Sequence, residues 1–287
     1  MKMLAIAAAF AVLLPASAHA VEYTVAASPR THCDGVTACN AEAFCPAGLF
    51  PYGGGVIGDQ AKIESSYVIQ IGNDRGWRAS FRGAFFEYGV TAHGNATAYV
   101  ICGPNPGGYT TSVSLFQSCT ENIHGSCAAA AVCPSGWTLL SGGVDGNQSQ
   151  LEYSASEGND QWVATWYPDA GDFGASVNSN ARAYAICGHA SPQDLTPWQE
   201  DPQTCTVDGP SCTSTVTCPI GQVVIGGGFY GIESKIESMG PVSATTWQAT
   251  WYPATEELGA SAKGAGAAIA YCATGNAPDA MFGNGFD

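Results

Sequence analysis

The sequence predicts an all-β protein built from three tandem repeats of about 85 residues, each stapled by disulfides. A Cys-Pro pair opens each repeat, at Cys45, Cys133 and Cys218. In every repeat a glutamate follows that cysteine by 19 residues, and the closing cysteine follows a tryptophan by 25 residues. Each repeat also holds short segments of alternating apolar and polar residues, without a convincing helical period. These observations predict four short strands per repeat and about twelve strands in all.

The repeats are separated by polar, proline-bearing joints at 104–117 and 191–203. Two arrangements are open: a β-prism-like fold, with three four-stranded sheets around a pseudo-threefold axis, or three separate small β modules. A module of about 70 residues covers a large aromatic face poorly, so we favour the prism. The predicted regions are a signal peptide at 1–20, repeat 1 at 30–107, repeat 2 at 116–192, repeat 3 at 202–276 and a C-terminal tail at 277–287.

The N-terminus has the three parts of a secretory signal peptide. Lys2 supplies the positive start, residues 4–14 form the apolar core, and residues 18–20 form a small-residue cleavage site, so the mature chain should begin near Val21. No later stretch approaches the roughly 20 apolar residues that a bilayer-spanning helix needs. We therefore expect a secreted protein without a membrane span, either extracellular or in the periplasm or on the outer surface of a Gram-negative bacterium.

The chain is acidic, with 9 Lys+Arg against 24 Asp+Glu. Loss of Lys2 with the signal peptide leaves 8 basic against 24 acidic residues, a formal charge of −16 for the mature chain. This charge repels phosphate backbones, which excludes nucleic acid as a partner. Because 46% of the residues are hydrophobic and 10% aromatic, the chain can bury a core, and we do not expect disorder.

Twelve cysteines, four per repeat, together with an export signal indicate disulfides in an oxidising compartment. A zinc site is the alternative, but no Cys-x-x-Cys pair occurs and the histidines do not repeat, so we expect no metal and no cofactor. Four cysteines allow three pairings per repeat. The favoured pairs are Cys33–Cys39, Cys45–Cys102, Cys119–Cys127, Cys133–Cys187, Cys205–Cys212 and Cys218–Cys272.

The first predicted strand of each repeat contains the motif Cys-Pro-x-Gly-x4-[Gly/Ser]-Gly-Gly-x-x-Gly, at 45–58, 133–146 and 218–231. Glycine at fixed offsets in a buried strand indicates positive φ, a bulge or close approach of two backbones. A phosphate-binding loop would need a helix directly after the glycines, and the following residues are polar and non-helical. We therefore predict a structural use of these glycines.

The second predicted strand carries the repeated glutamate, at 62–65, 150–153 and 235–238. The third begins at the repeated tryptophan, and period-two alternation places its two aromatic residues on one face, which we predict to be the core face. The fourth strand ends at the closing cysteine. The predicted core aromatics are Trp77, Phe81, Trp162, Trp166, Trp247 and Trp251.

The framework of Cys-Pro-x-Gly, Gly-Gly, Trp and Ala-Tyr-x-Ile-Cys, the last at 98–102 and 183–187, resembles modules of exported bacterial proteins of uncharacterised function. More distantly it is similar to the vitelline membrane outer layer family, which implies three repeats and a β-prism fold. That family's acidic loop after its glycines is not found in all three copies, so the resemblance assigns no binding residue. Residues 282–287 resemble the Phe-x-x-Gly-Phe-acid tails of gammaproteobacterial exported proteins. This implies an address or processing tag, with a frayed polar terminus as the alternative.

The repeated glutamates, Glu64, Glu152 and Glu237, are candidate ligand contacts, because a residue kept in all copies has a shared role. The structural alternative is a strand residue that hydrogen-bonds the neighbouring glycine turn. Two carboxylates about 5 Å apart could also catalyse retaining glycoside hydrolysis.

Exposed tyrosine and tryptophan rings stack on sugars, so outward-facing aromatics are the second set of candidates. The first repeat departs from the pattern, because Arg82 stands where the other repeats have tyrosine. The aromatic candidates are Tyr153, Tyr167, Tyr252 and Trp198.

Together these features favour a non-catalytic binding protein for glycan, cell-surface or matrix components, in which three weak equivalent sites would raise avidity. A structural envelope or matrix protein without a small ligand is the alternative, and a glycan-acting hydrolase is the third hypothesis. Serine-elbow, His-Glu-x-x-His and Ser-x-x-Lys motifs are absent, and every cysteine has a plausible disulfide partner, so no catalytic residue is assigned. The sequence leaves the oligomeric state open.

Overall fold

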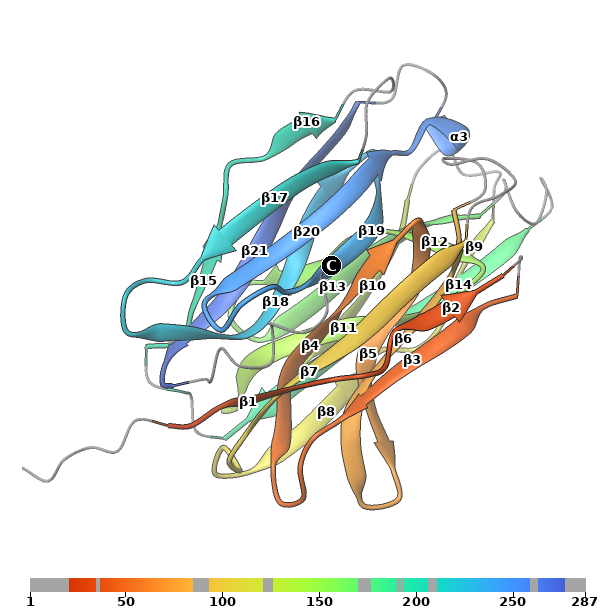
Figure 1. The fold of residues 1–287 in the computed structure, drawn as a ribbon. Coiled ribbons are helices and arrows are strands. Elements are labelled where there is room, and N and C mark those ends of the chain that lie inside the picture. Colours follow the sequence, from red (N-terminus) through yellow and green to blue (C-terminus); the bar gives the residue numbers. More distant parts are fainter. Residues whose placement is uncertain are drawn as a thin grey trace, which may run out of the picture.

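The computed structural model confirms an all-β fold (Figure 1). The part of the chain that it describes forms 21 strands and one short helix, α3 (Thr255–Leu258), and every ladder between named strands is antiparallel. The predicted signal peptide and C-terminal tail lie outside the described residues. Those residues are 21–34, 37–84, 93–120, 126–169, 177–189, 192, 194–205, 211–258 and 263–276.

Each repeat contributes seven strands in the same order. In repeat 1 they are β1 (Thr24–Ala27), β2 (Thr31–Cys33), β3 (Cys39–Phe44), β4 (Phe50–Asp59), β5 (Ala61–Ile71), β6 (Asp74–Gly83) and β7 (Gly94–Gly103). In repeat 2 they are β8 (Tyr109–Val113), β9 (Gln117–Thr120), β10 (Cys127–Val132), β11 (Thr138–Asn147), β12 (Ser149–Glu157), β13 (Gln161–Pro168) and β14 (Asn178–Gly188). In repeat 3 they are β15 (Thr196–Gln199), β16 (Gln203–Cys205), β17 (Cys212–Thr217), β18 (Gln222–Ile232), β19 (Ser234–Pro241), β20 (Thr246–Pro253) and β21 (Gly264–Thr274).

The strands form three seven-stranded sheets, each shared by two repeats. Sheet I joins repeats 1 and 2 in the order β3-β6-β5-β11-β14-β8, with β9 also on β14. Sheet II joins repeats 2 and 3 as β10-β13-β12-β18-β21-β15, with β16 on β21. Sheet III joins repeats 3 and 1 as β17-β20-β19-β4-β7-β1, with β2 on β7. The first, second, fourth and seventh strands of each repeat lie in one sheet, and the other three lie in the next sheet. The change of sheet between the fourth and fifth strands takes place at a corner residue with positive φ: Gln60, Gln148 or Glu233.

Sheet III closes the ring between the first and last repeats. Val56 of β4 pairs with Met239 of β19, so the orange and blue strands lie side by side (Figure 1). The Tyr23 amide also donates to the Asn276 carbonyl at 2.8 Å, which joins the two ends of the described chain. These contacts confirm the pseudo-threefold prism and show that the alternative of three separate modules is wrong.

The strand count differs from the prediction of four per repeat and four per sheet. The missed strands are the three short ones before each Cys-Pro pair, and the predicted joints 104–117 and 191–203 contain β8 and β15. β8 and β15 are short, polar edge strands with no buried side chain of their own to produce a clear alternation. Pairing with the closing strand of their own repeat, rather than local pattern, makes them strands.

The repeated glycines lie where the strand packs closely against a tryptophan ring or against the backbone of a neighbouring repeat. All six predicted core aromatics are buried. A Cβ atom on Gly54, Gly142 or Gly227 would lie 2.2–2.4 Å from an indole atom of the same repeat, so no larger residue fits. A register shift next to the first position of each set, Gly53, Ser141 or Gly226, adds a bulge. Among the glycines of this motif, positive φ occurs only in the Cys-Pro-x-Gly turn, as at Gly48 with φ 85°.

All six disulfides have the predicted pairing. The long bridges join residues 54–57 apart and connect the Cys-Pro turn to the closing strand of each repeat. The short bridges join residues 6–8 apart and hold the third strand of a repeat beside its second strand.

Candidate functional site

The three repeated glutamates are buried within the fold. Glu64, Glu152 and Glu237 are 3%, 6% and 5% exposed. Each carboxylate accepts a hydrogen bond from the corner amide of the next repeat in the ring, at 2.8–3.0 Å. A left-handed backbone conformation costs a non-glycine residue about 1–2 kcal/mol. The hydrogen bond to the carboxylate helps to hold the corner residue in that conformation. The carboxylates are therefore engaged with the fold. The pairs are Glu64–Gln148, Glu152–Glu233 and Glu237–Gln60.

Tyr167, which the sequence placed on the outer surface, is buried beside its glutamate. Its hydroxyl donates to Glu152 Oε1 at 2.5 Å, and Thr165 Oγ1 donates to Oε2 at 2.9 Å. Tyr252 occupies the equivalent place in repeat 3 and is only partly buried. The alternation of side chains placed Tyr167 on the face opposite the core tryptophans, but the corner of the neighbouring repeat covers this end of the strand.

Repeat 1 replaces this tyrosine with a buried charge cluster. Arg82 Nη2 lies 2.9 Å from Glu64 Oε1 and also contacts Asp169 of repeat 2. Lys62 Nζ lies 3.8 Å from Asp169 Oδ1, and the Gln150 amide donates to the same oxygen at 2.6 Å. Burial raises the pKa of Glu64; burial also acts to raise the pKa of Asp169, but Lys62 and Arg82 outweigh it and hold that pKa below its ordinary value. The cluster neutralises its own charges and joins repeats 1 and 2.

The other two aromatic candidates lie apart on sheet II. Trp198 is 46% exposed on the edge strand β15. Tyr153 is partly buried and meets Tyr230 edge to face, with 5.9 Å between ring centroids, and burial raises its pKa to about 12. No hydrogen bond or ring contact connects Trp198 to Tyr153 in the described part of the chain. The structure thus does not gather the sequence-predicted residues into one site.

A different set of side chains comes together on the outer face of sheet I. Cross-strand register puts Glu42, Arg78, Tyr67, Gly143 and Tyr184 in one row across five strands. Arg78 Nε donates to Glu42 Oε1 at 2.7 Å, and its Nη1 donates to the Tyr67 hydroxyl at 3.4 Å. Because Gly143 has no side chain, the rings of Tyr67 and Tyr184 stack across it with centroids 5.0 Å apart.

A second arginine flanks this aromatic pair on its other side. Arg182 donates through Nε and Nη2 to Asp145 Oδ2, at 3.0 and 2.9 Å. Its guanidinium lies over Phe116, 4.3 Å from the ring centroid, and 5.2 Å from the Tyr184 centroid. Burial raises the pKa of Tyr184 to about 12, so the ring is neutral at ordinary pH. The face therefore presents stacked rings between two arginine–carboxylate pairs.

A hollow of about 290 Å³ opens beside the row. Tyr67, Tyr184, Arg78, Tyr109 and Arg75 are among its lining residues. The Tyr109 hydroxyl is buried and has no hydrogen-bond partner among the described residues. Arg75 forms no ion pair with any of them, and its Nε is likewise unpartnered. A bound molecule could satisfy both groups, since buried polar atoms normally have partners.

The other two sheets lack this chemistry at the same positions. Their rows contain neither a charged side chain nor two aromatic rings, so the site is single and not threefold. The equivalent rows are Ala130, Val163, Ala155, Gly228 and Ile269 in sheet II, and Thr215, Gln248, Gly240, Gly55 and Tyr99 in sheet III.

The sequence analysis missed this face because it looked for residues shared by the repeats. Aligning the copies three residues after the glutamate gives Tyr67, Ala155 and Gly240, so tyrosine occurs once. A tyrosine found in only one copy could have marked this position as distinct. The proximity of Tyr184 could not be predicted, because this residue belongs to another repeat and its position depends on how the sheets are shared.

The chain matches no protein-family model and none of the curated proteins. Within the described ranges no helix is long and apolar enough to cross a membrane. Six disulfides are typical of an extracellular or otherwise oxidising compartment.

Proposed function

We propose that this chain is an exported, non-catalytic binding protein whose outer face on sheet I binds a glycan of a cell surface or matrix. The observation that carries the proposal is the hollow beside the stacked Tyr67 and Tyr184, where aromatic rings, arginines and an unsatisfied hydroxyl converge. Ligand sites are typically apolar hollows with a few convergent polar groups.

Sugar chemistry fits these side chains. The C–H groups of a sugar ring pack on an aromatic face, while planar guanidinium groups bind pairs of oxygen atoms. The hollow is near the lower limit of about 300–1,000 Å³ for small-molecule pockets, which suits a segment of a chain that enters and leaves at the open surface.

Charge favours an acidic glycan over a neutral one. The chain as a whole carries a formal charge of −15, yet Arg75, Arg78 and Arg182 lie together on this face. Arg78 and Arg182 have carboxylate partners, whereas Arg75 has none among the described residues. A sugar carboxylate or sulfate would supply that partner.

The proposed location is extracellular, or the periplasm or outer surface of a Gram-negative bacterium. The signal-like N-terminus and the disulfides support it. The resemblance to exported bacterial modules and to the vitelline membrane outer layer family agrees with export and with a prism, and adds no binding residue. A structural envelope or matrix role is the second candidate, favoured by the engagement of all three repeated glutamates within the fold.

A depletion assay tests the binding proposal. Mature protein, from residue 21 onward, is incubated with insoluble acidic and neutral polysaccharides and with cell walls, and the protein left in solution is measured. We expect selective depletion by an acidic polysaccharide, competed by its soluble fragments. Arg78→Ala should weaken retention about tenfold, the loss of one charge-assisted hydrogen bond. The matched control is Gln248→Ala, at the same row position in sheet III, which should leave retention unchanged.

Two outcomes would contradict the proposal. Equal retention of Arg78→Ala and wild type would remove the sheet I face as the site. No depletion by any material, from protein with a normal melting temperature, would favour the structural role. Release of new reducing ends from a polysaccharide would instead revive the hydrolase hypothesis.

A further inference from the structure

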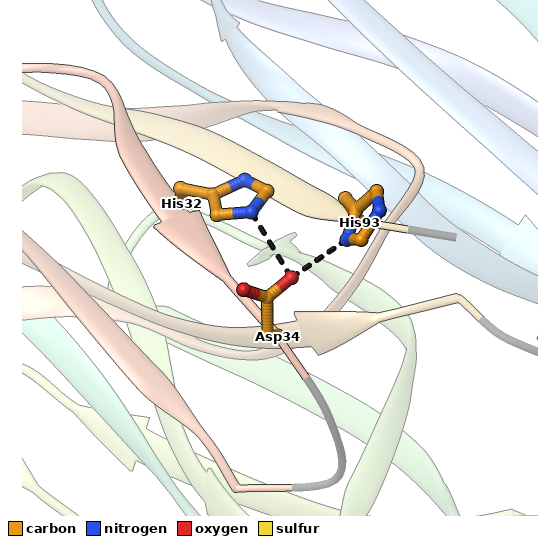
Figure 2. Close-up of side chains that lie close together, drawn as sticks. All are labelled: His32, Asp34 and His93. Atoms are coloured by element: carbon orange, nitrogen blue, oxygen red, sulfur yellow. Dashed lines mark hydrogen bonds and ion pairs between the residues drawn. The ribbon is translucent and has the colours of Figure 1, made fainter. Parts of the chain in front are cut away.

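An exposed cluster of two histidines and an aspartate lies at the edge of sheet III, away from the sheet I face. β2 pairs with β7 so that His32 lies opposite Asn95, and Asp34 and His93 come directly after the end of β2 and directly before the start of β7. Figure 2 shows both imidazole rings directed at the Asp34 carboxylate. The Cys33–Cys39 disulfide joins the end of β2, next to Asp34, to the start of β3.

The ligand atoms are close enough to share one cation. Asp34 Oδ1 lies 3.0 Å from His32 Nε2 and 2.6 Å from His93 Nδ1, and the three ligand atoms lie within 4.8 Å of one another. Two atoms bound at about 2.1 Å to a tetrahedral ion are about 3.4 Å apart. Changes of about 1 Å in the separations of these exposed side chains would therefore bring the three atoms to the spacing that an ion requires.

Asn95 orients His32 for metal binding. Its Nδ2 donates to the His93 carbonyl at 3.0 Å, which fixes the amide so that Oδ1 faces His32 Nδ1, also at 3.0 Å. Because an amide oxygen only accepts, His32 Nδ1 donates to it, and Nε2, the atom beside Asp34, is the nitrogen left to bind an ion. A hydrogen bond to the second ring nitrogen is the usual support of a metal-bound histidine.

We propose that His32, Asp34 and His93 bind a divalent transition-metal ion of the zinc or copper class. Imidazole nitrogen with one carboxylate oxygen suits these ions better than Mg²⁺ or Ca²⁺, which prefer oxygen alone. The three side chains are 52%, 67% and 61% exposed, so the ion can enter from solvent. Three protein ligands leave a fourth position for water or a ligand group.

Calorimetric titration with Zn²⁺ tests the proposal. The protein is the mature chain without a polyhistidine tag, treated with chelator and then dialysed. We expect one ion per chain, and a melting temperature that rises with Zn²⁺. Asp34→Asn and His93→Ala should each weaken binding at least tenfold. Asn95→Ala should weaken it about 10–100-fold, the usual effect of losing an outer-shell partner.

The matched control is His189→Ala. This histidine is also exposed but stacks on Trp137, at 4.6 Å between ring centroids, and contacts none of the three residues. The His189→Ala variant should bind Zn²⁺ as the wild type does. Because the ligand side chains are exposed, every variant should keep the metal-free melting temperature. Absence of binding by the wild type, or unchanged binding by His93→Ala, would overturn the proposal and leave a hydrogen-bonded histidine–aspartate cluster only.

Discussion

Replacing Glu152 with alanine should destabilise the protein by about 3 kcal/mol. The carboxylate accepts hydrogen bonds from the Glu233 amide, the Tyr167 hydroxyl and the Thr165 hydroxyl. Each donor left without a partner in a buried place costs about 1–3 kcal/mol. The partly exposed Thr165 can be rehydrated, and the variant no longer buries a carboxylate, so the net loss falls well below the sum of three bonds.

Two further variants sharpen this prediction. Glu152→Gln keeps an oxygen at the Oε1 position for the corner amide, so it should cost only about 1 kcal/mol, roughly one ordinary hydrogen bond. Glu157 lies on the same strand but is exposed, so Glu157→Ala should change stability by less than about 0.5 kcal/mol. The three variants separate the buried acceptor from the loss of a negative charge.

Urea unfolding with the disulfides intact, followed by tryptophan fluorescence, measures these differences. An unchanged m value with a lower midpoint for Glu152→Ala would show a loss of native stability. The reasoning is refuted if Glu152→Ala and Glu157→Ala unfold at the same urea concentration. An equal loss in Glu152→Gln and Glu152→Ala would instead show that the negative charge, and not an acceptor at Oε1, holds the corner.

Three other predictions follow from the same contacts. Gly142→Ala places a Cβ atom 2.3 Å from an indole carbon and should prevent secretion of folded protein, whereas Gly158→Ala, in an open turn at φ 73°, should cost only about 1 kcal/mol in urea. The pKa of Asp169 is lower in the folded chain than its ordinary 3.8. The ionised carboxylate therefore adds to the free energy of unfolding above that pH, and this contribution is lost as the pH falls. Urea midpoints of Asp169→Asn should therefore decline less than those of wild type below about pH 4. Removing the Cys45–Cys102 bridge, which spans 57 residues, should cost about 4 kcal/mol, measured against an otherwise identical chain.

The sequence was informative wherever the three copies agree. Agreement at the cysteines, glycines and tryptophans reflects contacts that recur by symmetry, so the period predicted the disulfides, the buried aromatic face and the prism. Trp162 against Gly142 is one instance of a contact found in every repeat. A contact that recurs in all three repeats requires the same residue types in each, so its sequence pattern occurs three times in one chain.

The sequence was uninformative where partners come from different repeats. The glutamates repeat, but nothing local shows that the corner residue of the next copy covers Glu152 and buries Tyr167. The edge strands β8 and β15 were missed for a related reason, because their partner strands belong to the same repeat but lie more than 60 residues away in the chain. The metal candidate joins His32 to His93 across a comparable distance, so the separate histidines gave no motif.

The departures from symmetry concentrate at the seam between repeats 1 and 2. Arg82 stands there in place of the tyrosine of the other copies and contacts Asp169, and sheet I, built from the same two repeats, carries the charged aromatic row. Corner residues are limited by burial, since each change needs a compensating partner, as Arg82 needs carboxylates. Outer-face residues have solvent on one side, so they can change with fewer compensating partners, even where they contact another repeat as Tyr67 contacts Tyr184. A fold constrained in this way acquires a specific binding surface most readily on one outer face, which is why a single site on sheet I is a better expectation than three equal ones.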